Sequence, residues 1–353
     1  MLVGGKGTRL RPLTMSAPKP MLPVAGVPVT AHMLARARDA GIDRVVLATS
    51  YKAEVFEEYF GDGSAHGLEL AYVTETEPLG TGGAIRNVAD FLRSGPDEPV
   101  VIFNGDILSG LDIRALVARH TDSGAAVTLH LTEVEDPRAF GVVPTDEQGR
   151  VTAFLEKTPD PPTNLINAGC YVFRRSVIDD IPAGRPVSVE RETFPGLLAA
   201  GVPIAAYPDS TYWLDLGTPA AFVRGSRDLV LGRIASSALP GPVGEALVLG
   251  GATLAADAKL CGGATIGAGA TVGSGATVDG AVLFDGARIG DGAQVRDSVV
   301  GRDAVIRDGV VLDGVVIGDG ARVEPGNELR AGVRVFPGSV LPAGCVRFSS
   351  DQS

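Results

Sequence analysis

The last third of the chain carries a hydrophobic repeat with a period of about six residues. Gly, Ala, Asp and Thr stand between the apolar positions, as in the segment Ile266-Gly-Ala-Gly-Ala-Thr. A period of six fits neither a helix nor an alternating strand, but it fits a coil of three short flat sides, each directing one apolar residue inward. The apolar positions are six residues apart, with three steps of five: Leu254, Leu260, Ile266, Val272, Val278, Phe284, Ile289, Val295, Val300, Ile306, Val311, Ile317, Val323, Leu329, Val335 and Leu341. The repeat therefore predicts a β-helix of about five coils.

The first two thirds of the chain alternate between strand-like and helix-like segments. We expect strands at 44–48, 68–73, 100–103 and 125–131, and helices at 54–60, 81–93 and 112–120. Strands that alternate with helices indicate an α/β fold with a doubly wound, Rossmann-like and mostly parallel sheet. Ligands of such sheets bind outside the carboxyl ends of the strands, so unusual residues at those ends are candidates for a site.

The composition changes between these two regions. All six Tyr and the single Trp precede residue 235, and the segment Ser236-Ser-Ala-Leu-Pro-Gly-Pro reads as a linker. We therefore expect a catalytic domain at 1–235 and a β-helix domain at 236–353.

Charge and composition exclude several classes of protein. The net charge of −11 disfavours a nucleic-acid binder or a ligand of anionic membranes. No run reaches the ~18 apolar residues of a membrane span, and no secretory signal precedes Lys6. The three cysteines are far apart, which favours a reducing cytoplasm over a disulfide framework. The first 38 residues nevertheless hold six bases and no acid, which indicates a local anion site.

A glycine-rich segment in this basic region can hold phosphate. It reads Gly4-Gly-Lys-Gly-Thr-Arg-Leu-Arg11 and is neither a Walker A loop nor a dinucleotide fingerprint. Glycines let backbone amides close around phosphate oxygens, and arginines add charge in a planar fork. Lys19 follows between Pro18 and Pro20, which restrict the backbone on both sides, although an isolated lysine is more often solvated.

Two aspartates and the histidines each have an ordinary structural interpretation. Asp106 follows the apolar run 100–103 in an Asn-Gly-Asp turn, and Asp215 precedes Gly-Thr-Pro where a helix cap would stand. The four histidines (His32, His66, His120 and His130) have no metal-ligand spacing and are expected at the surface or in packing. Cys170 lies in an apolar run and is expected to be buried and inert.

Taken together, these segments resemble the signature of the sugar-1-phosphate nucleotidyltransferases. The match includes Gly-Gly-Lys-Gly-Thr-Arg-Leu followed by Pro-Lys-Pro, and the blocks that begin at Glu77, Asn104, Phe154, Asn167, Ser188 and Trp213. Members of this family often append a left-handed β-helix, and within the family the chain is most similar to mannose-1-phosphate guanylyltransferases. One departure is that only Met1-Leu-Val precede the loop, where the family has a longer first strand.

The resemblance implies an enzyme that joins GTP to mannose-1-phosphate and releases pyrophosphate, without a covalent intermediate. It implies that Arg9, Lys19, Asp106 and Asp215 are catalytic and that Asp106 and Asp215 bind Mg²⁺. Nucleotide-binding residues would be Gly4, Gly5, Gly7, Thr8, Arg9, Gly80, Thr81 and Gly82. Sugar-phosphate-binding residues would be Gly141, Glu156, Lys157 and Asn167. The β-helix is expected to support a homo-oligomer.

Three alternatives remain open on the sequence. The first is another nucleotidyltransferase, such as a thymidylyl- or adenylyltransferase for glucose-1-phosphate or a guanylyltransferase for a different sugar. The second is a regulatory subunit that binds a sugar nucleotide without catalysis, although Arg9, Lys19, Asp106, Lys157 and Asp215 are all present. The third is an additional acyltransferase activity of the β-helix, which is disfavoured because residues 241–353 contain no histidine base.

Overall fold

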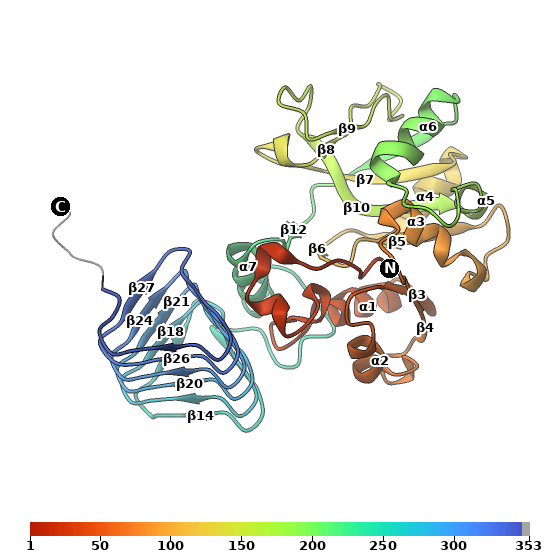
Figure 1. Cartoon of the computed structure of the whole chain (residues 1–353). Helices are drawn as coiled ribbons and strands as arrows, with labels where there is room; N and C mark the ends of the chain where they lie inside the picture. Colours follow the sequence, from red (N-terminus) through yellow and green to blue (C-terminus); the bar gives the residue numbers. More distant parts are fainter. Residues whose placement is uncertain (348–353) are drawn as a thin grey trace. The chain divides into compact units, whose positions relative to one another are not determined.

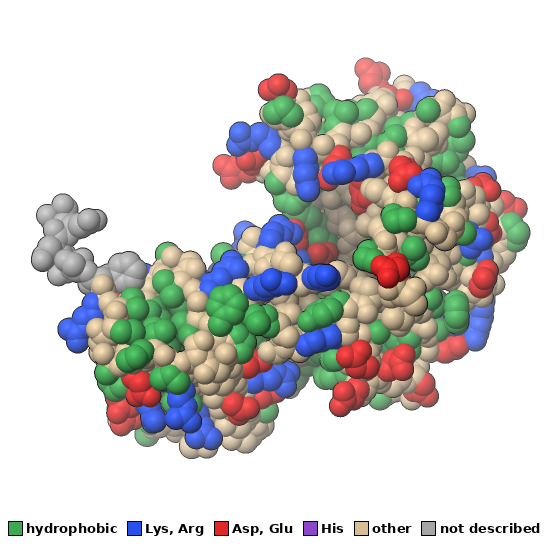
Figure 2. Space-filling model, in the orientation of Figure 1, with side chains coloured by type: hydrophobic (Ala, Val, Ile, Leu, Met, Phe, Trp, Pro, Cys, Tyr) green, Lys and Arg blue, Asp and Glu red, His purple; other side chains and the backbone are tan. Residues whose placement is uncertain are grey.

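The computed structural model describes residues 1–347 and divides into two compact units. The first unit consists of Met1–Gly5 and Arg36–Trp213, and the second consists of Lys6–Ala35 and the chain from Leu214 onward. The glycine-rich segment is therefore divided, because Gly4 and Gly5 belong to the first unit and the chain from Lys6 belongs to the second. Acidic and basic side chains are both spread over the face of the molecule in Figure 2. Within residues 1–347 no helix has the length and apolar character needed to cross a bilayer.

The sheet of the first unit is mostly parallel, as predicted, but β10 and the short β9 run in the opposite direction. Strand β10 pairs antiparallel with both β5 and β7, whereas β11 pairs parallel with β7 and β3 pairs parallel with β4. Figure 1 traces these strands and their connecting helices. The strands of this unit are β3 (Arg44–Thr49), β4 (Glu69–Thr74), β5 (Pro99–Phe103), β6 (Ile107–Ser109), β7 (Val127–Glu133), β8 (Gly141–Val142), β9 (Leu155–Glu156), β10 (Leu165–Arg174) and β11 (Ile204–Pro208).

The helices of this unit begin close to where the sequence predicts them. The predicted helix at 81–93 is shorter than expected, because α3 ends at Asn87 and a separate 3₁₀ turn covers Ala89–Phe91. Asp112 caps α4 by accepting hydrogen bonds from the amides of Arg114 and Ala115. The helices are α2 (Glu54–Phe60), α3 (Gly80–Asn87), α4 (Ile113–Ser123), α5 (Arg175–Asp179) and α6 (Phe194–Ala199).

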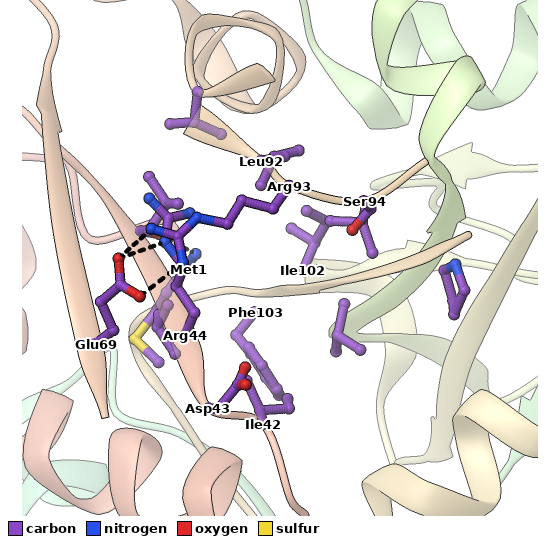
Figure 3. A pocket seen from close by; sticks show the side chains of 16 residues that line it. Met1, Ile42, Asp43, Arg44, Glu69, Leu92, Arg93, Ser94, Ile102 and Phe103 are labelled. Atoms are coloured by element: carbon purple, nitrogen blue, oxygen red, sulfur yellow. Dashed lines mark hydrogen bonds and ion pairs between the residues drawn. The ribbon is translucent and has the colours of Figure 1, made fainter. Parts of the chain in front are cut away.

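The first three residues of the chain lie against the strands of the first unit, and Met1 lines a cavity there. Leu2 forms single parallel bridges to Ala48 and Asn104, so the first strand is limited to this residue. The α-amino group of Met1 donates to the Val46 carbonyl at 2.8 Å, and burial lowers its pKa to about 5. Side chains of β3 and β5, with Glu69, line a cavity of about 440 Å³ (Figure 3).

The second unit contains the predicted β-helix. Its strands form three parallel sheets, a stack of about five coils that is consistent with the left-handed form. Two predicted inward positions are wrong by one residue: Leu283 and Leu312 fill the core instead of Phe284 and Val311. The five-residue step falls before position 283 rather than after it, and after position 312 rather than before it. Phe284 therefore leaves the core and packs on Phe222 at 6.3 Å between ring centroids.

The three sheets form three faces of the β-helix. The first sheet contains β13 (Ala246–Val248), β16 (Ala264–Ile266), β19 (Val282–Leu283), β22 (Val299–Val300), β25 (Val316–Ile317) and β28 (Arg334–Val335). The second contains β14 (Thr253–Leu254), β17 (Thr271–Val272), β20 (Arg288–Ile289), β23 (Val305–Ile306), β26 (Arg322–Val323) and β29 (Val340–Leu341). The third contains β15 (Lys259–Cys261), β18 (Thr277–Asp279), β21 (Gln294–Arg296), β24 (Val311–Asp313) and β27 (Glu328–Arg330).

The first of these sheets packs against the rest of the second unit, and we call it the covered face. Ser226 of α7 (Pro219–Val230) contacts Thr265 with 3.0 Å between hydroxyl oxygens, and its hydroxyl also accepts from the Ala25 amide. Arg227 donates to the Gly262 carbonyl and pairs with Asp297. The unit also includes β1 (Pro23–Val24), β2 (Val27–Pro28) and most of α1 (Val29–Asp39), while β12 (Trp213–Asp215) crosses the boundary. Residues 6–35, α7 and the β-helix therefore form one packed body.

Candidate active site

The glycine-rich segment is an exposed turn whose backbone requires glycine. Gly7 has a φ of +54° and begins the 3₁₀ turn Thr8–Leu10, and a Cβ there would lie 2.9 Å from the Cβ of Lys19. A larger residue at this position would clash and would be strained. The Thr14 hydroxyl donates to the Gly7 carbonyl at 3.0 Å, and Leu10 is fully buried, so the turn is anchored beneath its exposed surface.

Gly4 and Gly5, which begin the same segment, belong to the first unit. Both are exposed, and the Gly5 amide donates to the Ser50 hydroxyl at 3.1 Å. Ser50 directly follows β3, so this end of the segment lies at the carboxyl end of a parallel strand. That is the position where a doubly wound sheet binds its ligand.

Lys19, Asp215 and Arg9 form a charged cluster in the second unit. The ammonium of Lys19 lies 3.4 Å from one Asp215 oxygen, and Arg9 lies 3.7 Å from the other. The Lys19 side chain is 9% exposed, whereas that of Arg9 is 67% exposed. Lys19 is thus not the solvated lysine that its isolated sequence would suggest. Its burial between two prolines fixes a cation in place, while Arg9 extends toward solvent.

Asp215 does not cap a helix in this structure. The cap of α7 is Thr218, whose side chain accepts a hydrogen bond from the Ala221 amide. The ordinary structural interpretation of Asp215 is therefore excluded, and its carboxylate instead faces two cations. This arrangement holds the carboxylate in a fixed position at the end of β12.

Asp106 occupies the turn between β5 and β6 in the first unit. The turn is held by backbone bonds, because the Asn104 amide donates to the Gly169 carbonyl at 2.8 Å and the Gly105 amide donates to the Leu2 carbonyl at 2.7 Å. Asp106 is half-buried in the turn that follows β5, so the turn interpretation is correct and is compatible with a ligand role. Among residues 1–347 no group of three or more His, Cys, Asp or Glu side chains is arranged to hold a metal.

Gly80, Thr81 and Gly82 begin helix α3, as predicted. A neighbouring segment already engages part of this terminus: the Gly82 amide donates to the Val187 carbonyl at 2.8 Å. The Thr81 hydroxyl donates to Glu190 at 2.8 Å and accepts from the Val189 amide at 3.0 Å. The sequence did not reveal that residues 187–190 support this helix start.

Glu156, Lys157 and Gly141 lie together on a small antiparallel pair of strands. Gly141 of β8 is directly opposite Glu156 of β9. Glu156 therefore belongs to a short strand of its own. Lys157 has a φ of +53°, its amide donates to the Phe140 carbonyl, and its ammonium lies 3.7 Å from Glu156. A non-glycine residue with positive φ is uncommon and often marks a functional position.

Asn167 lies in β10 where the pairing with β7 is interrupted by a bulge. Its amide nitrogen donates to the Tyr171 hydroxyl at 2.8 Å, and its oxygen accepts from the Gly169 amide at 3.0 Å. Burial raises the pKa of Tyr171, which keeps this hydroxyl protonated. Trp213 donates to the Ala168 carbonyl and packs edge-on against Phe140. This aromatic pair was not singled out from sequence, although Trp213 is the only tryptophan.

The histidines and Cys170 occupy packing positions. His32, His120 and His130 are buried, and burial lowers the pKa of each. Burial also raises the pKa of Cys170 to about 12, so this thiol is not a nucleophile near neutral pH.

Comparisons with known proteins agree with the resemblance seen in the sequence. Residues 1–230 match the family model described as nucleotidyl transferase, and residues 243–344 match the GMPPB C-terminal domain. The chain is 62% identical over 256 residues to the mannose-1-phosphate guanylyltransferase of Mycobacterium tuberculosis, a match that covers 72% of this chain and 70% of the relative. It is 40% identical to the mannose-1-phosphate guanylyltransferase catalytic subunit beta of Drosophila pseudoobscura pseudoobscura, covering 64% of this chain and 60% of that relative.

A solved structure supports the fold of the first two thirds of the chain. HddC from Yersinia pseudotuberculosis is similar with a TM-score of 0.56 and 27% identity, covering 64% of this chain and 96% of that one. The same protein has also been solved in complex with GMP-PN.

Proposed function

Because the chain belongs to the nucleotidyl transferase family, we propose that it transfers the guanylyl group of GTP to mannose-1-phosphate and releases GDP-mannose and pyrophosphate. The observation that carries this choice of substrates is the 62% identity to a mannose-1-phosphate guanylyltransferase. The complex of the similar HddC with GMP-PN supports a guanine nucleotide. In this reaction the phosphate oxygen of the sugar attacks the α-phosphorus in line, so no protein nucleophile is required.

The second unit would hold the triphosphate. The exposed turn at Gly7 and Thr8 and the side chain of Arg9 would bind phosphate oxygens, with Gly4 and Gly5 continuing the cradle from the first unit. Lys19 would lie beside the reacting phosphates, where a buried cation stabilises negative charge more strongly than a solvated one. The start of α3 at Gly80, Thr81 and Gly82 would contact the base and ribose. The support for this assignment is the fixed cluster of Lys19, Asp215 and Arg9.

Asp106 and Asp215 would hold a magnesium ion. Both are carboxylates at the ends of strands, and such oxygen donors, completed by phosphate and water oxygens, suit this hard cation. When bound, the ion supplies positive charge to the phosphate oxygens and so lowers the repulsion between the two polyanionic substrates. Lys19 and Arg9 hold the Asp215 carboxylate for this purpose.

The first unit would bind the sugar phosphate. Lys157 would contact the phosphate, and Glu156 would accept hydrogen bonds from sugar hydroxyls. Asn167 and the Gly141 backbone would read further hydroxyls, beside the aromatic pair of Phe140 and Trp213. The support is that Lys157 is exposed on a strained turn directly next to Glu156.

Three further features belong to the proposal. The limits of the family models support a catalytic domain at 1–235 and a β-helix domain at 236–353. The β-helix would mediate a homo-oligomer. The three cysteines form no disulfide, which supports a cytoplasmic enzyme.

A substrate matrix tests the proposal. The protein is incubated with Mg²⁺ and each combination of GTP, ATP, TTP or UTP with mannose-1-phosphate, glucose-1-phosphate or another sugar-1-phosphate, and pyrophosphate release is measured. The proposal requires the highest kcat/KM for GTP with mannose-1-phosphate. A preference for TTP or ATP with glucose-1-phosphate would change the proposed substrates but leave the proposed type of reaction unchanged. Nucleotide binding without pyrophosphate release in any combination would instead indicate a regulatory subunit.

A further inference from the structure

One outward-facing position of the covered face differs from the others in its row. Parallel pairing aligns six residues along this face, one from each strand: Leu247, Thr265, Val282, Val299, Val316 and Arg334. The first five are at most 3% exposed, as expected for a surface against which other segments pack. The sixth is an exposed arginine. An arginine at this position can take a partner outside the β-helix.

That partner is the glycine-rich segment. One guanidinium nitrogen of Arg334 donates to the carbonyl of Arg9 at 2.9 Å and to the carbonyl of Arg11 at 2.7 Å. The two carbonyls lie on either side of the buried Leu10, and all of these residues belong to the second unit. Arg334 therefore holds the backbone of the segment from the β-helix, more than three hundred residues later in the chain.

We propose that Arg334 is a positioning residue for the triphosphate, acting through Arg9. The proposal rests on the proposed function, in which Arg9 binds phosphate. The segment needs such an anchor because its glycines give it more conformational freedom than other residues would, and this freedom must be lost when a ligand binds. Leu10 and the hydrogen bond from Thr14 hold the start of the turn. Arg334 holds the backbone of Arg9 itself and of Arg11, where the turn ends.

The fixed backbone determines where the Arg9 side chain extends. This side chain is 67% exposed, and its terminal nitrogen is 3.7 Å from Asp215, so packing holds it only weakly. An anchored backbone reduces the range of positions that this arginine samples before the triphosphate arrives. Arg334 also adds a positive charge next to the segment, which favours an incoming polyanion.

Three variants of the full-length protein test the proposal. Arg334→Ala removes both hydrogen bonds and should raise the KM and Kd for GTP about three- to tenfold, the usual effect of losing exposed bonds of this kind. The KM for mannose-1-phosphate and the melting temperature should change little. Arg334→Lys keeps a donor and a charge, so it should restore part of the GTP affinity. Arg322→Ala, at an exposed arginine of the second sheet, is the matched control and should behave like the wild type.

Hydrogen exchange gives a readout that does not depend on activity. Without nucleotide, amides in the peptide that covers residues 6–13 should exchange faster in Arg334→Ala than in the wild type or in Arg322→Ala. Wild-type protein that binds GTP while Arg334→Ala has the same Kd and the same exchange would overturn the inference. Equal increases in the KM of both substrates would also overturn it. Wild-type protein that binds no nucleotide would contradict the proposed function instead, and the exchange comparison would still decide whether Arg334 orders the segment.

Discussion

The two units hold their candidate lysines in opposite ways. In the second unit Lys19 has a 9% exposed side chain, lies between prolines and faces Asp215. In the first unit the side chain of Lys157 is 63% exposed and extends from a turn with positive φ beside Glu156. A buried cation with a fixed position suits the place where charge develops during the reaction. An exposed lysine suits the capture of a substrate that enters from solvent. The comparison therefore fits the proposal that Lys19 lies where charge develops and that Lys157 recognises a substrate.

The two units also differ in how their sites are assembled. The sugar-side residues Gly141, Glu156 and Lys157 lie close together in sequence on the short strands β8 and β9. The charged residues proposed for the triphosphate, Arg9 and Lys19, come from residues 6–35, and Arg334 of the β-helix donates to the Arg9 carbonyl. Variants that disrupt the β-helix should therefore weaken GTP binding more than they weaken mannose-1-phosphate binding.

The largest effect is expected from removal of the charge of Asp106 or Asp215. Asp106→Asn and Asp215→Asn keep the shape of the side chain but weaken magnesium binding, so kcat should fall by about two to four powers of ten, equivalent to roughly 3–5 kcal/mol. Thermal stability should change little in Asp106→Asn. It should fall more in Asp215→Asn, because the carboxylate that faces the buried Lys19 is lost. Steady-state kinetics over a range of Mg²⁺ concentrations measure the effect, and near-normal turnover of both variants at saturating Mg²⁺ would refute the metal site.

The next largest effect is expected from truncation at Ser236, which removes the β-helix. The truncated chain exposes the surface of α7 that packs on it, including Phe222, which is fully buried in the full-length protein. Exposure of even one or two large apolar side chains costs about 3 kcal/mol, so the melting temperature and the assembly state should both change. GTP affinity should fall more than affinity for mannose-1-phosphate. A truncated protein with its native assembly state and an unchanged melting temperature would contradict this account.

Protonation of His130 at acidic pH should lower the stability of the first unit. Burial lowers the pKa of His130 to about 4 although Asp209 lies 3.6 Å away, whereas the unfolded chain has the ordinary value near 6.5. Between pH 4 and pH 6.5 the unfolded state binds more protons than the folded state. The stability that depends on neutral His130 is therefore fully present above pH 6.5 and is lost as the pH falls toward 4. His130 should account for a loss of about 2 kcal/mol between pH 7.5 and pH 5. Urea unfolding of His130→Gln at both pH values should show a smaller loss than the wild type.

The matched control for this measurement is His66→Gln, which removes a half-buried histidine of the same unit that packs on Tyr59 and Phe60. It should keep the pH dependence of the wild type. If His130→Gln loses as much stability between pH 7.5 and pH 5 as His66→Gln does, His130 is not the group responsible.

The features that the sequence predicts well are those determined by local periodicity. The six-residue repeat predicts most core positions of the β-helix because every coil repeats the same environment, and the errors at Phe284 and Val311 arise where one corner is a residue shorter. The direction of β10 was not predictable, since a continuous apolar strand has the same pattern in either direction. The partner of Lys19 was not predictable, because Asp215 is distant in the sequence. The cap of α7 at Thr218 is instead a local contact with the Ala221 amide. Arg334 was missed because its row of neighbours is visible only after the coils are aligned.

The proposed division between the units is tested most directly by the KM of each substrate in variants of Lys157 and Arg9. Lys157→Ala should raise the KM for mannose-1-phosphate about ten- to hundredfold, equivalent to about 1.5–3 kcal/mol, and should change the KM for GTP much less. Arg9→Ala should instead raise the KM for GTP and should change the KM for mannose-1-phosphate much less. Lys52→Ala is the control, because Lys52 is also a lysine with positive φ in the first unit and should leave both values unchanged. If Lys157→Ala and Arg9→Ala each change the two KM values equally, these residues act by general electrostatics and the proposed division between the units is wrong.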